Sequence, residues 1–204
     1  KLYGDTRDLH SFPTRRSSDL TGEKQLPLLL HELCKIEGIE WIRLLYCYPE
    51  EITDELIKVI KTEEKVCNYI DMPIQHSENR ILQRMGRRTS REDLVAVIKK
   101  LRQEIPDITI RTTLITGFPG ESEEDHEGLM NFVEECKFDR LGVFTYSPEE
   151  DTLAATFEDQ IDEEVKEARR DELMSLQQEI SYEHTQQLVG KTIRVMVEIG
   201  RAHV

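Results

Sequence analysis

The 204-residue sequence predicts an α/β fold made of parallel strand–helix units. Short β-branched and aromatic runs alternate four times with segments of helical periodicity. Each of these runs ends in a polar or glycine-rich cluster, as strands of a parallel sheet do beside a binding site. Because such sheets are normally buried on both sides, we expect both faces to be covered. After Thr152 the alternation stops and a long charged segment begins.

The strands and helices follow in order from hydrophobic periodicity and capping residues. Four strands are expected over residues 39–48, 69–74, 108–115 and 140–146. Six helices are expected: residues 26–36, a helix capped by Thr53, residues 78–85, one opened by the capping box Thr89–Glu92, one opened by Ser122, and residues 161–187. The last helix has a predicted buried stripe of Val165, Leu173, Leu176 and Ile180, and residues 191–198 alternate like a strand.

Charge and cysteine content limit the class of protein. The net charge of -14 argues against nonspecific binding to nucleic acid or an anionic membrane, which requires basic side chains. The sequence contains no apolar run of roughly 18 residues and no secretory signal, so we expect a cytoplasmic protein without a membrane partner. Cys34, Cys47, Cys67 and Cys136 form no CxxC pair, which indicates reduced and mostly buried thiols.

The two ends of the sequence differ from the rest. HSFPTRRSSDL (10–20) back-translates to a common sequencing adapter, and IGRAHV (199–204) back-translates to the start of the opposite adapter. The alternative is that these residues form a flexible arm and a frayed tail. Because an adapter match occurs at both ends, we expect residues 1–20 and 199–204 to be adapter-derived and residues 1–20 to be disordered. The natural segment would divide into an α/β part (21–160), a linking helix (161–187) and the start of a β module (188–198).

Candidate binding residues lie where the predicted strands end. They are Tyr46, Cys47 and Tyr48 at the end of the first strand, Gln75, His76 and Ser77 after the second, Gly117, Phe118, Pro119, Gly120 and Glu121 after the third, and Tyr146 and Ser147 at the end of the fourth. Parallel strands present their carboxyl ends at one edge of a sheet, so these clusters should converge on one polar pocket. The sequence singles out no catalytic residue and no metal ligand.

Each cluster also has a structural alternative. Gly117 and Gly120 either let a ligand approach the backbone or form a tight strand-to-helix turn. His76 is either an acid–base group or ligand, or a capping histidine, and the sequence indicates no carboxylate partner for it. Arg84, Arg87 and Arg88 either hold a carboxylate or form a solvated helix end.

Three longer stretches resemble one enzyme family: DMPIQHSENRILQRMGRR (71–88), TTLITGFPGESEED (112–125) and FDRLGVFTYSPEEDT (138–152). They are similar to the methylthiotransferase branch of the radical S-adenosylmethionine (SAM) enzymes. The tRNA-modifying members of that branch carry PVQSGS and YSPRPGT versions. MPIQHS and YSPEEDT instead resemble the RimO type, which methylthiolates an aspartate of ribosomal protein S12. The resemblance covers residues 21–198.

The resemblance implies a fold and a set of cofactors. The chain would be the C-terminal portion of a partial (βα)6 TIM-like barrel, followed by the first strand of a TRAM β-barrel. The parent enzyme would use SAM, two 4Fe–4S clusters and an electron donor. This sequence has no CxxxCxxC motif, so the cluster-binding cysteines are expected upstream and the isolated chain is expected to be inactive.

The resemblance also implies roles for the candidate residues. The segment from Gly117 to Glu121 would line the adenine and methionine parts of SAM, with Gln75, His76 and Ser77 beside it. Arg87 or Arg88 would meet the SAM carboxylate, and Tyr146 and Ser147 would belong to the last barrel strand. A tRNA methylthiotransferase is the alternative function, and a non-catalytic α/β fragment is the alternative of another class.

Overall fold

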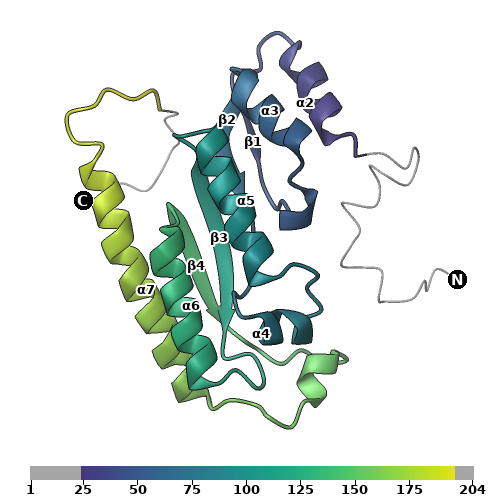
Figure 1. The fold of residues 1–204 in the computed structure, drawn as a ribbon, viewed down its shortest axis with the longest axis vertical. Helices are drawn as coiled ribbons and strands as arrows, with labels where there is room; N and C mark the ends of the chain where they lie inside the picture. Colours follow the sequence, from purple (N-terminus) through teal and green to yellow (C-terminus); the bar gives the residue numbers. More distant parts are fainter. Residues whose placement is uncertain (1–23, 196–204) are drawn as a thin grey trace, which may run out of the picture.

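The computed structural model describes residues 24–195, which form a parallel sheet with helices (Figure 1). The four strands are β1 (Ile42–Leu44), β2 (Val66–Asp71), β3 (Thr109–Thr116) and β4 (Arg140–Thr145). They lie in the order β1-β2-β3-β4, and every neighbouring pair is parallel. The predicted α/β class and strand–helix alternation are confirmed. The adapter-like residues 1–20 and 199–204 lie outside the described residues.

The described residues also form six α-helices and two short 3-10 helices, which precede, connect and follow the strands. The α-helices are α2 (Leu26–Cys34), α3 (Asp54–Thr62), α4 (Asn79–Arg84), α5 (Arg91–Glu104), α6 (Glu123–Cys136) and α7 (Glu163–Gln186). The 3-10 helices are η2 (Pro49–Glu51) and η3 (Leu153–Thr156). No described helix is both long enough and apolar enough to cross a membrane.

The described helices cover one face of the sheet, which corrects the prediction that both faces are covered. Figure 1 shows α3, α5 and α6 over the same side of the strands. Along β3, Ile110, Thr112 and Leu114 are buried, whereas the alternating residues Arg111 and Thr113 are only partly buried. Right-handed crossovers that all step in the same direction place every helix on one side, as in a barrel wall.

The start of α5 differs from the predicted Thr89–Glu92 capping box. The N-cap is Ser90, whose hydroxyl accepts a hydrogen bond from the Asp93 amide (3.2 Å), while the Ser90 amide donates to Asp93 Oδ2 (2.9 Å). The Glu92 carboxylate instead accepts from Asn79 Nδ2 (3.1 Å). A tertiary contact therefore removes Glu92 from the capping role, and the box shifts by one residue.

The buried face of α7 also differs from the predicted stripe. Val165 is 39% exposed, and its neighbour Lys166 is buried. The buried positions are Lys166, Arg169, Leu173, Gln177 and Ile180, so two bases occupy the first turns of the face. The prediction from apolar residues missed Lys166 and Arg169 because it assumes that every lysine and arginine is exposed to solvent. Leu173 and Ile180 were predicted correctly.

The predicted strand over residues 191–198 is only partly described. Residues 191–195 carry no regular secondary structure, and residues 196–198 lie outside the described range. The start of a separate β module therefore stays a prediction.

The corrected helix cap can be tested by mutation. We expect Ser90→Ala to lower the free energy of unfolding by ~1 kcal/mol, because the Asp93 amide loses its acceptor. Thr89→Ala, the matched control, should change it by less than ~0.5 kcal/mol. Urea unfolding followed by circular dichroism measures both, and a larger loss for Thr89→Ala than for Ser90→Ala would restore the original prediction.

Candidate functional site

The polar clusters that follow the strands lie at one edge of the sheet, because all four strands are parallel. Gln75 pairs with β3 through its backbone: its amide donates to Thr113 O (3.0 Å), and the Ile115 amide donates to Gln75 O (2.7 Å). The Tyr146 amide donates to Thr116 O (2.9 Å). The segments after β2, β3 and β4 are therefore adjacent in space, as predicted.

The turn after β3 is held from inside by the Glu121 carboxylate, whose side chain is fully buried. Glu121 Oε2 accepts from the Gly117 amide (2.8 Å), and Oε1 accepts from the Thr116 hydroxyl (3.2 Å). Arg169 Nη1 of α7 donates to Glu121 Oε1 (2.9 Å) and to the Glu121 carbonyl (3.0 Å). The carboxylate thus closes the turn on itself and ties it to a distant helix.

The two glycines of the turn are required by packing. Gly117 and Gly120 have φ values of +71° and +80°, in the left-handed region that favours glycine. A Cβ atom on Gly117 would overlap the Lys166 side chain, and one on Gly120 would overlap the Asp159 carboxylate. The space beside these glycines is therefore filled by the chain itself, which supports the tight-turn alternative for both.

His76 has a carboxylate partner that the sequence did not reveal. Its side chain is fully buried, and Nε2 lies 3.4 Å from Glu121 Oε2. Nδ1 accepts a hydrogen bond from the Glu78 amide (3.0 Å). His76 is both the capping histidine of the structural alternative and a neighbour of a buried charge.

The surroundings of Glu121 set its protonation state. Burial alone raises the pKa of Glu121, but His76, Arg169 and the Gly117 amide more than offset burial, and the pKa lies below its usual value of 4.5. The carboxylate is therefore ionised at neutral pH.

An apolar cluster lies on the outer side of the turn. Phe118 contacts Tyr146 edge-on, with ring centroids 5.1 Å apart, and Phe157 at 6.3 Å. Ile81 of α4 completes the buried set. Pro119 is also buried. These contacts exclude water from the back of the turn and fix its orientation relative to β4.

Two buried side-chain oxygens at this edge have no hydrogen-bond partner among the described residues. They are Gln75 Oε1 and the Tyr146 hydroxyl. Gln75 also has a φ of 74°, which is strained for a residue with a side chain. Unsatisfied buried oxygens and backbone strain are both concentrated at functional sites, so the edge formed by Gln75, the turn and Tyr146 is the candidate site.

The remaining predicted residues lie apart from the turn or serve packing. Arg87 stacks over the Tyr48 ring, with its guanidinium carbon 5.4 Å from the ring centroid. Arg88 is exposed beside Lys24, Glu50 and Asp93. The buried Ser77 hydroxyl accepts from Arg91 (3.2 Å), and Ser147 is exposed.

Besides Arg169, Arg80 and Arg84 lie beside the turn. The sequence did not single out Arg80, whereas Arg84 was predicted to hold a carboxylate or to be solvated. Arg80 donates to the Gly120 carbonyl (2.7 Å) and pairs with Asp125. Arg84 donates to both carboxylate oxygens of Asp159 (2.7 and 2.9 Å). Their position on α4, immediately after the Gln75–Ser77 cluster, was the available signal.

The open face of the sheet carries a second group of charged residues that no motif indicated. Arg111 Nη1 of β3 donates to Asp71 Oδ1 of β2 (2.7 Å). The Arg43 guanidinium lies 5.3 Å from the Tyr69 ring centroid. Because aligned residues of parallel strands point to the same side, these residues share the face that the described helices leave uncovered.

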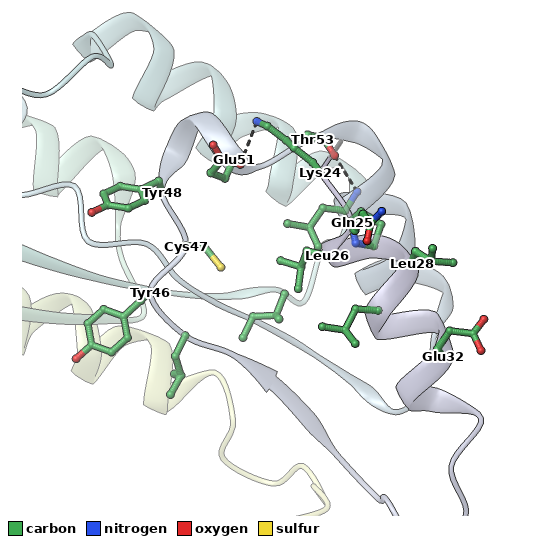
Figure 2. Close-up of a pocket in the computed structure, with 15 residues that line it drawn as sticks. Lys24, Gln25, Leu26, Leu28, Glu32, Tyr46, Cys47, Tyr48, Glu51 and Thr53 are labelled. Carbon is green, nitrogen blue, oxygen red and sulfur yellow. Dashed lines mark hydrogen bonds and ion pairs between the residues drawn. The ribbon is translucent and has the colours of Figure 1, made fainter. Parts of the chain in front are cut away.

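A cavity of about 650 Å³ lies elsewhere, between α2, the end of β1 and the start of α3 (Figure 2). Its walls are largely leucine: Leu26, Leu28, Leu29, Leu44, Leu45 and Leu56. In Figure 2 the Cys47 thiol points toward the cavity, whereas the rings of Tyr46 and Tyr48 point away from it. The strand-end cluster Tyr46–Tyr48 lines this cavity, whereas the clusters after β2, β3 and β4 do not. Polar residues of the lining include Lys24 and Glu51, which pair with each other (3.1 Å).

The cysteines do not form a metal site within the described residues. All four are free, and no group of three His, Cys, Asp or Glu residues there is placed to hold a metal ion. Burial raises the pKa of the Cys47 and Cys136 thiols to about 11, so both are protonated at neutral pH. The prediction of buried, inert thiols is confirmed for these two.

Comparison with known families adds independent evidence. Residues 4–133 match the sequence profile of the radical SAM superfamily. This range includes part of the adapter-like segment, whose origin stays a prediction. Among solved structures, the radical SAM methyltransferase TsrM from Kitasatospora setae has a TM-score of 0.48 and 18% identity, covering 58% of this chain and 24% of that chain. This structural similarity is too low to support an assignment of fold or function.

Curated relatives are much more similar. A protein of Lachnoclostridium phytofermentans is 62% identical over 180 residues, which cover 88% of this chain and 41% of the relative. A protein of Clostridium perfringens is 56% identical over 197 residues, covering 93% of this chain and 44% of the relative. Both are named ribosomal protein uS12 methylthiotransferase RimO. The chain thus spans about two fifths of the length of these relatives.

The buried charge of Glu121 predicts a pH-dependent stability. A carboxylate whose folded-state pKa is lowered contributes stability that is fully present above its unfolded-state value of about 4.5 and is lost as the pH falls through the folded-state pKa. We expect Glu121→Gln to be less stable than the wild type by ~1–3 kcal/mol near neutral pH. The difference should shrink on acidification through that folded-state value.

Urea unfolding at a series of pH values measures this difference. Glu124→Gln, which removes an exposed carboxylate from the same segment, is the matched control and should change stability little at any pH. A wild-type advantage over Glu121→Gln that does not depend on pH would contradict the assignment.

Proposed function

Because the chain belongs to the radical SAM superfamily, we propose that it forms part of an enzyme that methylthiolates the β-carbon of an aspartate in ribosomal protein S12. The main support for this substrate is the 62% identity to a relative named for that activity. The motif versions MPIQHS and YSPEEDT favour the same branch. The parallel sheet would be the C-terminal portion of a partial (βα)6 barrel, and residues 188–198 would begin a TRAM domain.

The candidate site fits SAM in one respect that the structure itself offers. The buried oxygens of Gln75 and Tyr146 lack partners among the described residues, and a polar ligand at this edge would supply donors for them. This observation carries the proposal for the cofactor site. We assign the backbone of the turn from Gly117 to Glu121 to the adenine and methionine parts of SAM. Arg87, stacked on Tyr48 at the end of β1, is the better candidate than Arg88 for the SAM carboxylate.

The residues of this chain would bind and orient SAM and exclude water from it. SAM supplies the transferred methyl group and, in this family, the radical that activates the substrate carbon. The buried side chains of Phe118, Pro119 and Ile81 pack behind the turn and exclude water from it. His76 and Ser77 are fully buried and support the turn through Glu121 and through α4, so we propose supporting roles for them. Ser147, exposed after β4, would contact the cofactor or the substrate.

The two 4Fe–4S clusters of the proposed parent do not fit the residues present. Cluster ligands are cysteine thiolates, and the sequence contains no CxxxCxxC motif. Two of its four cysteines are held as protonated thiols by burial. We therefore assign no cluster ligand to this chain.

The alternative substrate is an adenosine of tRNA. The net charge of -14 suits a basic ribosomal protein better than a phosphate backbone, which favours the first substrate. We propose ribosomal protein S12 and an electron donor as partners in the cytoplasm, with no membrane or nucleic acid partner. The alternative from a different class of function is a non-catalytic α/β fragment, and we expect the isolated chain to behave in this way.

The missing ligands predict that the isolated chain is inactive. After anaerobic reconstitution of the 204-residue chain with iron and sulfide, we expect no stable cluster absorbance and no 5′-deoxyadenosine from SAM. Absorbance spectroscopy and chromatography of the nucleoside products provide the two measurements. Stable cluster formation or cleavage of SAM by the chain would overturn the account of the ligands.

A graft tests the proposed substrate. Residues 24–195 would replace the matching segment of the Lachnoclostridium phytofermentans protein, which is long enough to supply the rest of the enzyme. We expect the graft to add a methylthio group to ribosomal protein S12 and not to tRNA, as measured by mass spectrometry of both substrates. The unaltered relative is the positive control. A graft that holds its clusters but modifies tRNA, or neither substrate, would contradict the proposal.

A further inference from the structure

The first turns of α7 carry two buried bases, Lys166 and Arg169, and both reach the candidate site. Lys166 is 4% exposed and Arg169 is 7% exposed. Lysine and arginine are rarely buried to this extent unless their charges are paired. The two residues are three positions apart on one helix, so their side chains lie on the same face. We call them the basic pair.

Lys166 holds the end of β4. Its Nζ donates to the Tyr146 carbonyl (3.0 Å) and lies 5.5 Å from the centroid of the Tyr146 ring. Its methylene groups fill the space that a side chain at position 117 would need. One side chain thus contacts both the turn after β3 and the segment after β4.

Arg169 holds the turn itself. Its Nη1 donates to the Glu121 carbonyl and carboxylate, and its Nη2 donates to Glu123 Oε2 (3.2 Å) at the start of α6. On the opposite side of the same carboxylate lies His76. The guanidinium therefore connects α7 to the turn, to α6 and, through Glu121, to the end of β2.

Stability alone does not account for these contacts. Desolvation of a buried ion pair often exceeds its coulombic gain, and apolar side chains of similar volume stabilise a core as well or better. A planar guanidinium adds fixed geometry, because its donors form a rigid fork, and the lysine ammonium adds a charge-assisted hydrogen bond to a defined backbone oxygen. Both bases donate to backbone carbonyls of the candidate site, at Glu121 and Tyr146.

We propose that Lys166 and Arg169 are positioning residues, which hold the Gly117–Glu121 turn and the Tyr146 segment in the arrangement that receives the cofactor. The inference rests on the proposed function, because SAM is the ligand proposed for this turn. It assigns to α7 a direct part in forming the site. The predicted role of that helix was only to link two domains.

Hydrogen–deuterium exchange of the 204-residue chain tests the basic pair without any need for activity. Arg169→Met and Lys166→Met remove the charge and retain an unbranched apolar side chain. We expect peptides covering residues 114–122 and 144–148 to exchange roughly tenfold faster in Arg169→Met, because charge-assisted hydrogen bonds to the turn are lost. Lys166→Met should accelerate mainly residues 144–148.

Three comparisons separate positioning from general destabilisation. Arg170→Met is the matched control, since Arg170 lies on the same helix and its side chain donates to the neighbouring Asp171, away from the turn. A peptide covering residues 66–72 in β2 reports on the rest of the sheet and should not change. Arg169→Lys should recover part of the protection. Equal acceleration of all peptides, or no acceleration in Arg169→Met, would overturn the positioning role.

A second arm adds SAM itself as the probe. We expect SAM to slow exchange of residues 114–122 in the wild type and in Arg170→Met, and to lose this effect in Arg169→Met. No effect of SAM on the wild type would overturn the cofactor site of the proposed function. Faster exchange in Arg169→Met without SAM would still support the basic pair, so the two failures are distinguishable.

Discussion

A buried carboxylate must have its charge compensated, and at Glu121 this requirement organises the whole edge of the sheet. The partners that keep it ionised are His76 after β2, the Gly117 amide after β3, and Arg169 on α7. The Thr116 hydroxyl, at the end of β3, also donates to it. An uncompensated charge at this depth would be strongly destabilising. Elements that are far apart in the sequence are therefore held within one ionic contact network. The turn in the middle of that network is the segment for which we propose cofactor binding.

The arrangement of the helices determines what the rest of the sheet can do. Since the described helices pack on one face, the other face presents Arg43, Tyr69 and Arg111, and the buried Asp71 carboxylate on this side accepts a hydrogen bond from Arg111. In barrel enzymes that face is the interior, and polar residues there contact ligands or other parts of the barrel. The turn held by Glu121 lies at the carboxyl edge of this same sheet. A ligand at the turn therefore has the charged face beneath it.

Periodic features were predictable from the sequence, and long-range polar contacts were not. The strands were found from β-branched runs, and Ser122 was correctly placed as the cap of α6 because its side chain bonds only three residues ahead. Thr89 failed as a cap because Asn79, ten residues earlier, engages Glu92. The partner of His76 lies forty-five residues away, beyond any local pattern. Lys166 and Arg169 were missed because a helix face predicted from apolar residues alone does not include buried basic side chains.

The distribution of charge near the turn also bears on the substrate. Half of residues 149–164 are acidic and none is basic. This segment runs against the turn, since the Gly120 amide donates to the Asp159 carbonyl (2.8 Å). Phosphates of a tRNA would be repelled there, whereas a basic protein would be attracted. Charge at the candidate site thus points to the same substrate as the sequence relatives.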